Sequence, residues 1–277
     1  MEVEPGDVVK FHCLDSSGGQ LGKNSTVDDF LKIDRNKIHT LTGPVAIKGA
    51  QPGDTLRVDV VNIQLRGWGW TSITPGLGFL PDRFPDPFLF IWQLDEESTD
   101  SLSPAVVPLR PFCGVMGVAP AAPGEMRTRP PGEFGGNMDA PEVSVGNTLY
   151  LPVNVSGALF YFGDGHAAMG DGEIAGSAIE VPMRVRLQFD VVKGKRTGWP
   201  RFENEKEIMT TGIYRPVDDA VRIAFTELVA WIHADYGLSE LDAYELLSKV
   251  AKIHLTEMVD PNYVVVASVE KKYLPKK

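Results

Sequence analysis

Glycine and proline divide this chain into short segments, and their spacing limits the folds that it can adopt. The 277 residues include 28 glycines and 21 prolines. Between them lie β-rich runs such as Thr55–Ile63, Val143–Leu151 and Val181–Val192. Short strands separated by turn residues are typical of β-sandwiches and β-barrels. We therefore predict a mainly β fold, with sandwich-like or barrel-like lobes in the N-terminal and central parts.

Two repeated turns and one irregular segment refine this prediction. Pro-Gly-Asp precedes a strand-like run at Pro5–Asp7 and again at Pro52–Asp54, and both turns are expected to mark strand entries. Gly67–Pro87 is rich in Gly, Trp, Pro and Phe without a clear period. It is predicted to be a long ordered loop, which either lies over a site or fills space in the packing.

The pattern changes after Trp199. Apolar residues at helical spacing predict a helix from about Val217 to Tyr236, which Gly237 would end. Ser239 is expected to cap a second helix that continues to about Ala251, and two further strands are predicted at Ile253–Thr256 and Tyr263–Val269. The chain is thus expected to divide into a mainly β catalytic region, residues 1–198, and a small α+β C-terminal unit, residues 199–277.

Composition and charge narrow the classes of partner. Hydrophobic residues make up 43% of the chain and charged residues 23%, which are values of a packed globular protein. The formal net charge of −10 disfavours binding to nucleic acid or to anionic membranes. The first ten residues lack the basic and apolar pattern of a secretory signal, so a cytoplasmic location is expected. Cys13 and Cys113 are too few for a disulfide framework or a four-cysteine zinc site.

The densest group of polar side chains is Gly163–Glu173, with the sequence GDGHAAMGDGE. It contains Asp164, His166, Asp171 and Glu173, and its glycines allow the backbone to bend so that several side chains converge. Imidazole and carboxylate suit zinc or another divalent ion, and further carboxylates could transfer protons. The alternative is a polar loop whose aspartates bind backbone amides. The apolar run Leu149–Phe162, expected as a strand, favours a site because rigid strands position functional loops.

Two other segments are candidates for the same site. In the second, Gly135–Asp139, Asp139 could bind a metal or act as a base, and Asn137 could donate a hydrogen bond to an amide oxygen; an ordinary turn is the alternative. In the third, Pro111–Gly117, small residues around Gly114 and Met116 could present backbone amides to an oxyanion.

The remaining histidines and aspartates carry weaker signals. His39, at the start of a predicted strand, and Asp15, before a Ser-Ser-Gly-Gly turn, are unremarkable alone. His12, His233 and His254 have apolar neighbours and are expected to be structural. The sequence contains no phosphate-binding loop, Gly-x-Ser-x-Gly elbow or dinucleotide fingerprint.

Four segments of this sequence resemble the acetamidase/formamidase family. The similarity extends to about Val192, and the most specific segment is the last. The segments are His39–Pro44 continuing through Gly49–Asp54, Arg110–Pro120, Gly135–Asp139 and Gly157–Glu173. The resemblance implies hydrolysis of formamide, acetamide or similar short amides, a mainly β scaffold, a homodimer or larger homo-oligomer, and a bound divalent metal in some members. Many relatives have Gln at Met169 and Cys at Ala175, so the identity of the amide is left open.

Together these observations predict an amidohydrolase that uses metal-activated water. A divalent ion is expected to be held by Asp139 and His166, together with His39, Asp15 or Asp164. Zinc is favoured, and calcium is the alternative as a structural ion. Glu173 or Asp171 would transfer the proton from water to the departing amine, and Glu173 is preferred.

Two alternatives remain open from sequence. The first is an amidase that uses Cys113 as a covalent nucleophile. The second is a non-catalytic, metal-stabilised β-domain that binds a small ligand.

Overall fold

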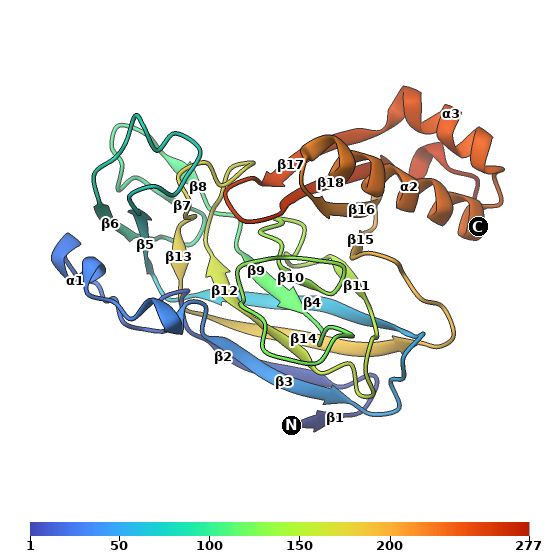
Figure 1. Cartoon of the computed structure of the whole chain (residues 1–277), viewed down its shortest axis with the longest axis horizontal. Coiled ribbons are helices and arrows are strands. Elements are labelled where there is room, and N and C mark those ends of the chain that lie inside the picture. The colour runs from blue at the N-terminus through green and yellow to red at the C-terminus, as the bar shows by residue number, and fades with distance from the viewer. Residues whose placement is uncertain (277) are drawn as a thin grey trace.

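Two eight-stranded sheets form most of the molecule (Figure 1). The computed structural model describes residues 1–276. The first sheet has the order β1 (Glu2–Val3), β3 (Leu41–Ile47), β12 (Phe160–His166), β13 (Glu180–Val181), β5 (Trp68–Ile73), β6 (Phe88–Gln93), and two more strands, β9 (Phe112–Gly117) and β10 (Gly135–Asn137), extend from β12.

The second sheet is longer and contains the C-terminal strands. Its order is β17 (Lys252–Glu257), β18 (Tyr263–Glu270), β16 (Glu207–Tyr214), β15 (Arg201–Glu203), β11 (Thr148–Pro152), β4 (Thr55–Leu65), β14 (Met183–Val192), β2 (Val8–Cys13). A separate two-stranded sheet joins β7 (Ser98–Thr99) and β8 (Val107–Pro108). The helices are α1 (Val27–Leu31), α2 (Val217–Tyr236), α3 (Glu240–Val250) and the short 3₁₀ turns at Arg35–Lys37 and Lys271–Tyr273.

Aromatic side chains join the two sheets in one core. Phe11 on β2 meets the ring of Phe162 on β12 edge to face, with ring centroids 5.1 Å apart. Phe189 on β14 contacts Phe160 on β12 at the same centroid distance. These strands belong to different sheets, so their inward faces pack against each other as in a β-sandwich. The predicted mainly β fold is confirmed.

Alternating burial explains why these segments form strands. Along β14 the buried residues Met183, Val185 and Leu187 alternate with exposed Arg184 and Arg186. This period of two places the apolar side chains on the inner face and the arginines on the outer face.

The C-terminal segment follows the sequence pattern closely. The first predicted helix matches α2, and Gly237 ends it in the left-handed region at φ 74°. Ser239 accepts a hydrogen bond from the backbone N–H of Asp242 and caps α3. In Figure 1 both helices lie beside β16 and β18 at the C-terminal end of the molecule. Because β15 pairs with β11, the second sheet continues across residue 198, and a division there stays a prediction.

Three segments differ from the sequence expectations. Residues 143–147 form a bend and a turn, with an isolated bridge from Ser144 to Phe112, so the strand predicted from Val143 begins at Thr148. The first part of the predicted loop Gly67–Pro87 is strand β5, which pairs with β6. The expected strand Leu149–Phe162 is two strands in different sheets, β11 and β12, separated by a bend at residues 157–159 in which all three have positive φ. Consequently Gly163–His166, expected in a loop, is the end of β12.

Between residues 1 and 276, no helix is both long and apolar enough to cross a bilayer.

The packing of α2 on β16 depends on a glycine and gives a test of the C-terminal unit. A Cβ at Gly212 would lie 2.7 Å from the carbonyl carbon of Ala220 and 2.8 Å from the backbone nitrogen of Ala224. Backbone atoms of a helix cannot move aside singly, so we expect Gly212→Ala to destabilise the protein by about 3 kcal/mol or more. Denaturant unfolding measures this change. Gly22→Ala, where the added methyl meets nothing within 4 Å, is the control, and equal stability of the two variants would contradict the packing described.

Candidate active site

A cavity of about 620 Å³ opens beside the ends of β10 and β12. Its wall includes side chains from both predicted regions of the chain: His39, Asp139, Asp164, Glu173, Glu180 and Asp260. Five of these six are acidic. A volume of this size is typical of small-molecule sites.

Strand β12 brings the first two functional side chains together. Asp164 and His166 are two residues apart on this strand, and alternation places their side chains on the same face. They are 3% and 1% exposed. In the antiparallel pair β12–β13, Glu180 lies directly opposite His166 and is equally buried. The strand pairing therefore fixes a histidine between two carboxylates.

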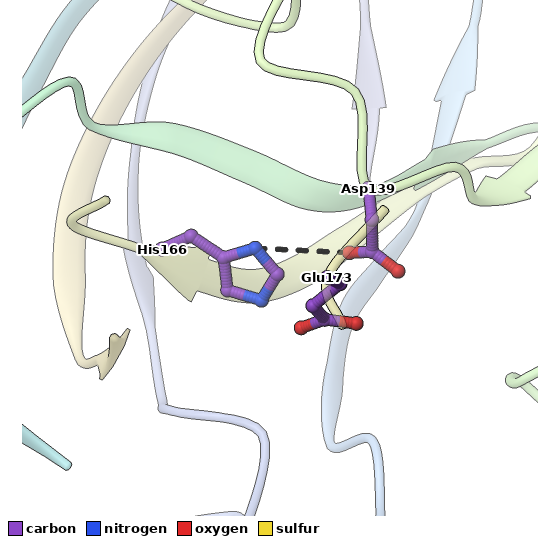
Figure 2. A group of neighbouring side chains, drawn as sticks. All are labelled: Asp139, His166 and Glu173. Carbon is purple, nitrogen blue, oxygen red and sulfur yellow. Dashed lines mark ion pairs between the residues drawn. The ribbon is translucent and has the colours of Figure 1, made fainter. Parts of the chain in front are cut away.

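The imidazole of His166 has carboxylates on both sides. Its Nε2 lies 3.4 Å from Asp164 Oδ1 and 3.4 Å from Glu180 Oε1. Its Nδ1 lies 3.7 Å from Asp139 Oδ1. Figure 2 shows Asp139 and Glu173 pointing toward this ring. Two overlapping groups could therefore hold a metal ion: Asp164 with His166 and Glu180, and Asp139 with His166 and Glu173.

Several atoms of this cluster have no hydrogen-bond partner within residues 1–276, although they are buried. They are both ring nitrogens of His166, Asp139 Oδ1, Asp164 Oδ1 and Glu180 Oε2. Buried polar atoms are nearly always paired, because an unpaired one costs about 1–3 kcal/mol. The cluster thus has the donor set and the unsatisfied atoms expected of a cation site.

Gly114 on β9 leaves space beside the cluster. A Cβ at this position would lie 2.5 Å from Asp139 Oδ1 and 2.8 Å from His166 Cε1. The carbonyl of Gly114 accepts hydrogen bonds from the backbone N–H groups of Met138 and Asp139, which hold the loop after β10 in place. Only glycine at position 114 leaves room for the side chains of Asp139 and His166 as they lie in the site.

Glu173 enters the site from a loop that the C-terminal unit supports. The N–H of Gly172 donates to the carbonyl of Thr256, and Gly172 forms a bridge with Glu257 on β17. Glu173 itself has a φ of 45°, and beside burial and the charge of Asp139, the charge of the neighbouring Glu257 carboxylate helps to raise its pKa. Two buried carboxyls that repel each other in this way are disfavoured from being ionised together.

Burial and charge set the protonation of these groups. Burial raises the pKa of Glu180 to about 7 and likewise that of Glu257. Burial, and then the charge of Asp139, raise the pKa of Glu173 well above its ordinary value. For His166, burial disfavours the imidazolium, but Glu180 and Asp164 outweigh it and raise the pKa. Burial also acts against ionisation of Asp164, yet His39 and His166 hold its pKa low.

The structure does not bring all predicted site residues together. His39 lies at the edge of the cluster, with Nε2 3.8 Å from Asp164 Oδ2. Asp15 belongs to neither of the two groups that could hold a metal ion, and its Oδ1 accepts hydrogen bonds from the backbone N–H of Ser17 and from Trp70 Nε1. Asp171 is exposed and faces His254, 3.4 Å away.

Residues predicted to bind substrate are also divided. Asn137 lines the cavity. Met116 is fully buried in the hydrophobic core. Gly114 contacts the cluster of carboxylates, as described above, and Cys113 is fully buried in the same core as Met116.

Sequence reasoning missed three carboxylates of the site: Glu180, Glu257 and Asp260. Glu180 stands within the apolar run Ala178–Val181, and an acidic residue in such a run was a signal that could have identified it. Glu257 and Asp260 lie in the C-terminal unit, where no local motif distinguishes them. Only in the folded chain does Glu257 lie near Glu173 and Asp260 accept a hydrogen bond from Asn137.

Comparison with known proteins identifies the family of this chain. The family model described as "Acetamidase/Formamidase family" matches residues 1–124 and 121–272. A formamidase from Methylophilus methylotrophus is 28% identical over a match that covers 89% of this chain and 76% of the formamidase. An acetamidase from Mycolicibacterium smegmatis is 29% identical over a match that covers 69% of this chain and 63% of the acetamidase. The crystal structure of an acetamidase from Yersinia enterocolitica has a TM-score of 0.91 and 33% identity, and the match covers 99% of this chain and 86% of that one. The chain therefore belongs to the acetamidase/formamidase family of amide hydrolases.

Proposed function

We propose that this chain cleaves the C–N bond of short linear amides, of the formamide or acetamide type, to ammonia and a carboxylate. The observation that carries the proposal is the buried His166, in a member of this family: carboxylates with unpaired oxygens flank its ring, and these carboxylates line a cavity. Imidazole, carboxylates and a further carboxyl that can transfer protons are the groups that hydrolysis with activated water requires.

Asp164, His166 and Glu180 are proposed to hold a divalent ion. Two ligand atoms at 2.0–2.1 Å from a tetrahedral zinc lie about 3.3–3.4 Å apart. The distances from Nε2 to Asp164 and Glu180 are both 3.4 Å, which fits this spacing. The mixed N/O donor set suits zinc. When bound, the ion would polarise the amide carbonyl and lower the pKa of water.

Asp139 is proposed to orient His166 rather than to bind the ion. Its Oδ1 lies 3.7 Å from Nδ1, on the side of the ring opposite the proposed ligands. A metal-binding histidine ordinarily donates its second N–H to a carboxylate, which fixes the ring and its tautomer. The backbone N–H of Asp139 donates a hydrogen bond to the carbonyl of Gly114, which keeps Asp139 beside the ring.

Glu173 is proposed as the group that transfers protons. It lines the cavity, and its buried carboxyl is close enough to Glu257 for the two to influence each other's protonation. The pair can accept a proton from the attacking water and return one to the departing nitrogen, which leaves readily only when protonated. Burial, and then the charge of Asp139, raise the pKa of Glu173, which favours the protonated form that donates to the nitrogen.

The two alternatives from sequence fit the structure less well. Burial raises the pKa of the Cys113 thiol well above its ordinary value, so the thiolate that a covalent route requires is disfavoured. A non-catalytic β-domain would not need the buried carboxyl pair beside a cavity. A homodimer or larger homo-oligomer stays a prediction from the resemblance.

Removing the thiol of Cys113 tests the covalent route. Because the side chain is inside the core, Cys113→Ala should keep at least about a tenth of the wild-type kcat for acetamide, with a moderate loss of stability. Ammonia release measures the rate. A loss beyond about a thousandfold in a folded variant, together with a thioester trapped in the wild type and seen by mass spectrometry, would favour the covalent route.

Replacing the carboxyl of Glu173 tests proton transfer. Glu173→Gln should lower kcat by a factor of about 10²–10⁴, because the side chain of the introduced glutamine cannot take up or release a proton. Zinc content and KM should stay near wild type. The comparison variant is Asp171→Asn, which changes an exposed carboxylate of the same loop and should retain kcat. Loss of the ion from Glu173→Gln would make Glu173 a ligand, and unchanged kcat would exclude it from catalysis.

The stability of the metal-free protein should depend on pH. Glu180 and Glu257 have pKa values of about 7 in the folded protein, above the 4.5 of an unfolded chain. Their contribution to stability is therefore complete below pH 4.5 and is lost as the pH rises through 7. The melting temperature of protein dialysed against a chelator should fall from pH 5.5 to pH 8.

Zinc should reverse the fall in melting temperature at high pH, because it binds the ionised carboxylates. The rise in melting temperature on adding zinc should be larger at pH 8 than at pH 5.5. Glu180→Gln is the matched variant, in which both the pH dependence and the zinc effect should shrink. An equal zinc effect in wild type and Glu180→Gln would contradict the proposed ligand set.

A further inference from the structure

Asn137 has one free atom in a buried, polar setting. The residue ends β10, is 3% exposed and lines the cavity. Its Nδ2 donates one hydrogen bond to Asp139 Oδ2, at 2.9 Å, and another to Asp260 Oδ2. Both N–H groups of the side chain are therefore used. Oδ1 is buried and has no hydrogen-bond partner among the described residues.

The orientation of this amide is fixed by chemistry. Asp260 is a carboxylate paired with Arg129, so its Oδ2 accepts a hydrogen bond, and exchanging Oδ1 and Nδ2 would place two acceptors against each other. The amide nitrogen therefore faces Asp260, and it also donates to Asp139. The atom left for a ligand is an acceptor, so Asn137 cannot donate to an amide oxygen as the sequence suggested.

Asp260 is itself held rigidly. Its Oδ1 accepts a hydrogen bond from Arg129 Nε at 2.8 Å, and its backbone N–H donates to Glu257 Oε1 at 2.7 Å. Arg215 donates to the carbonyl of Asp260 at 3.0 Å. These contacts come from three separate segments of the chain. They keep the Asn137 side chain in one position without any ligand.

We propose that Oδ1 of Asn137 accepts a hydrogen bond from the N–H of the substrate amide, and that this contact selects amides over esters. The inference rests on the proposed amide hydrolysis and adds a specificity-determining residue to it. A substrate with an N–H satisfies the buried acceptor, whereas an ester places an oxygen lone pair against it. A site built around one such bond rejects the analogue that lacks the hydrogen, because the buried group is then left unpaired.

The contact also positions the nitrogen for departure. As water adds to the carbonyl carbon, the nitrogen gains a basic lone pair, and Glu173 supplies the proton that allows the C–N bond to break. With one N–H directed at Oδ1, rotation about the C–N bond is restricted. Both Asn137 and Glu173 line the cavity. The products are ammonia and a carboxylic acid, so the atoms of amide and water are all accounted for.

A comparison of two substrates in two variants tests the proposal. The kcat/KM values are measured for acetamide and for methyl acetate in wild type and in Asn137→Ala. The substitution should lower kcat/KM for acetamide by about 10- to 100-fold more than for methyl acetate, since the ester makes no bond to Oδ1. Any general damage to Asp139 or Asp260 lowers both values and cancels in the ratio. Asn262→Ala, which removes a hydrogen bond to the carbonyl of Pro131 nearby, should leave the ratio unchanged.

A second measurement needs no variant. N-methylacetamide and methyl acetate have the same number of heavy atoms and differ in N–H against ester oxygen. As competitors of acetamide hydrolysis by the wild type, the amide should bind about tenfold more tightly. Equal inhibition, or equal losses for both substrates in Asn137→Ala, would overturn the role of Asn137 while amide hydrolysis stands. A wild type that releases no ammonia from acetamide or formamide would instead overturn the proposed function, and this inference with it.

Discussion

His166 is buried at the end of β12 between Asp139 on one side of its ring and Asp164 and Glu180 on the other. Placing this many ionisable groups out of water is costly unless charges compensate one another or a cation is bound. The surrounding backbone is arranged to permit it. Gly114 leaves room where a methyl group would contact Asp139 and His166, and Asp139, Asp164 and Glu173 all adopt positive φ. Strain of this kind persists where the fold requires an unusual direction of a side chain.

The C-terminal unit completes the site as well as extending the second sheet. Thr256 and Glu257 on β17 hold the loop that carries Glu173, and Asp260, just beyond β17, holds Asn137. The sequence segments that resemble the family lie before residue 192. Their function nevertheless depends on contacts with residues after 250. The packing of α2 on β16 therefore supports the chemistry indirectly, since both β16 and β17 pair with β18.

Local patterns predicted the helices and several strands because local physics determines them. Gly237 ends α2 and Ser239 caps α3, and both signals depend on neighbours in sequence alone. The group Asp139, Asp164, His166 and Glu173 was identified in the same way, from the density of polar residues and glycines. Pairing partners were not predictable. Glu180 joins the cluster because β13 lies beside β12, and this register depends on the folded sheet.

Single side chains illustrate the same limit. Asp171 and Glu173 are two residues apart in one motif, yet Asp171 faces His254 at the surface and Glu173 faces the cavity. Asp15 looked like a ligand but is engaged by Ser17 and Trp70. Asn137 was predicted to bind substrate, and it lines the cavity. Which of its atoms is available to a ligand depends on Asp260, which is 123 positions away in the chain.

The proposed position of the divalent ion can be measured directly. Crystals of the protein grown with zinc would be examined by anomalous diffraction at the zinc absorption edge. We predict one strong peak about 2.0–2.1 Å from Nε2 of His166, within bonding distance of Asp164 and Glu180. A peak on the Nδ1 side of the ring, bonded to Asp139 and Glu173, or crystals of active enzyme without a peak in this cluster, would contradict the proposed ligand set.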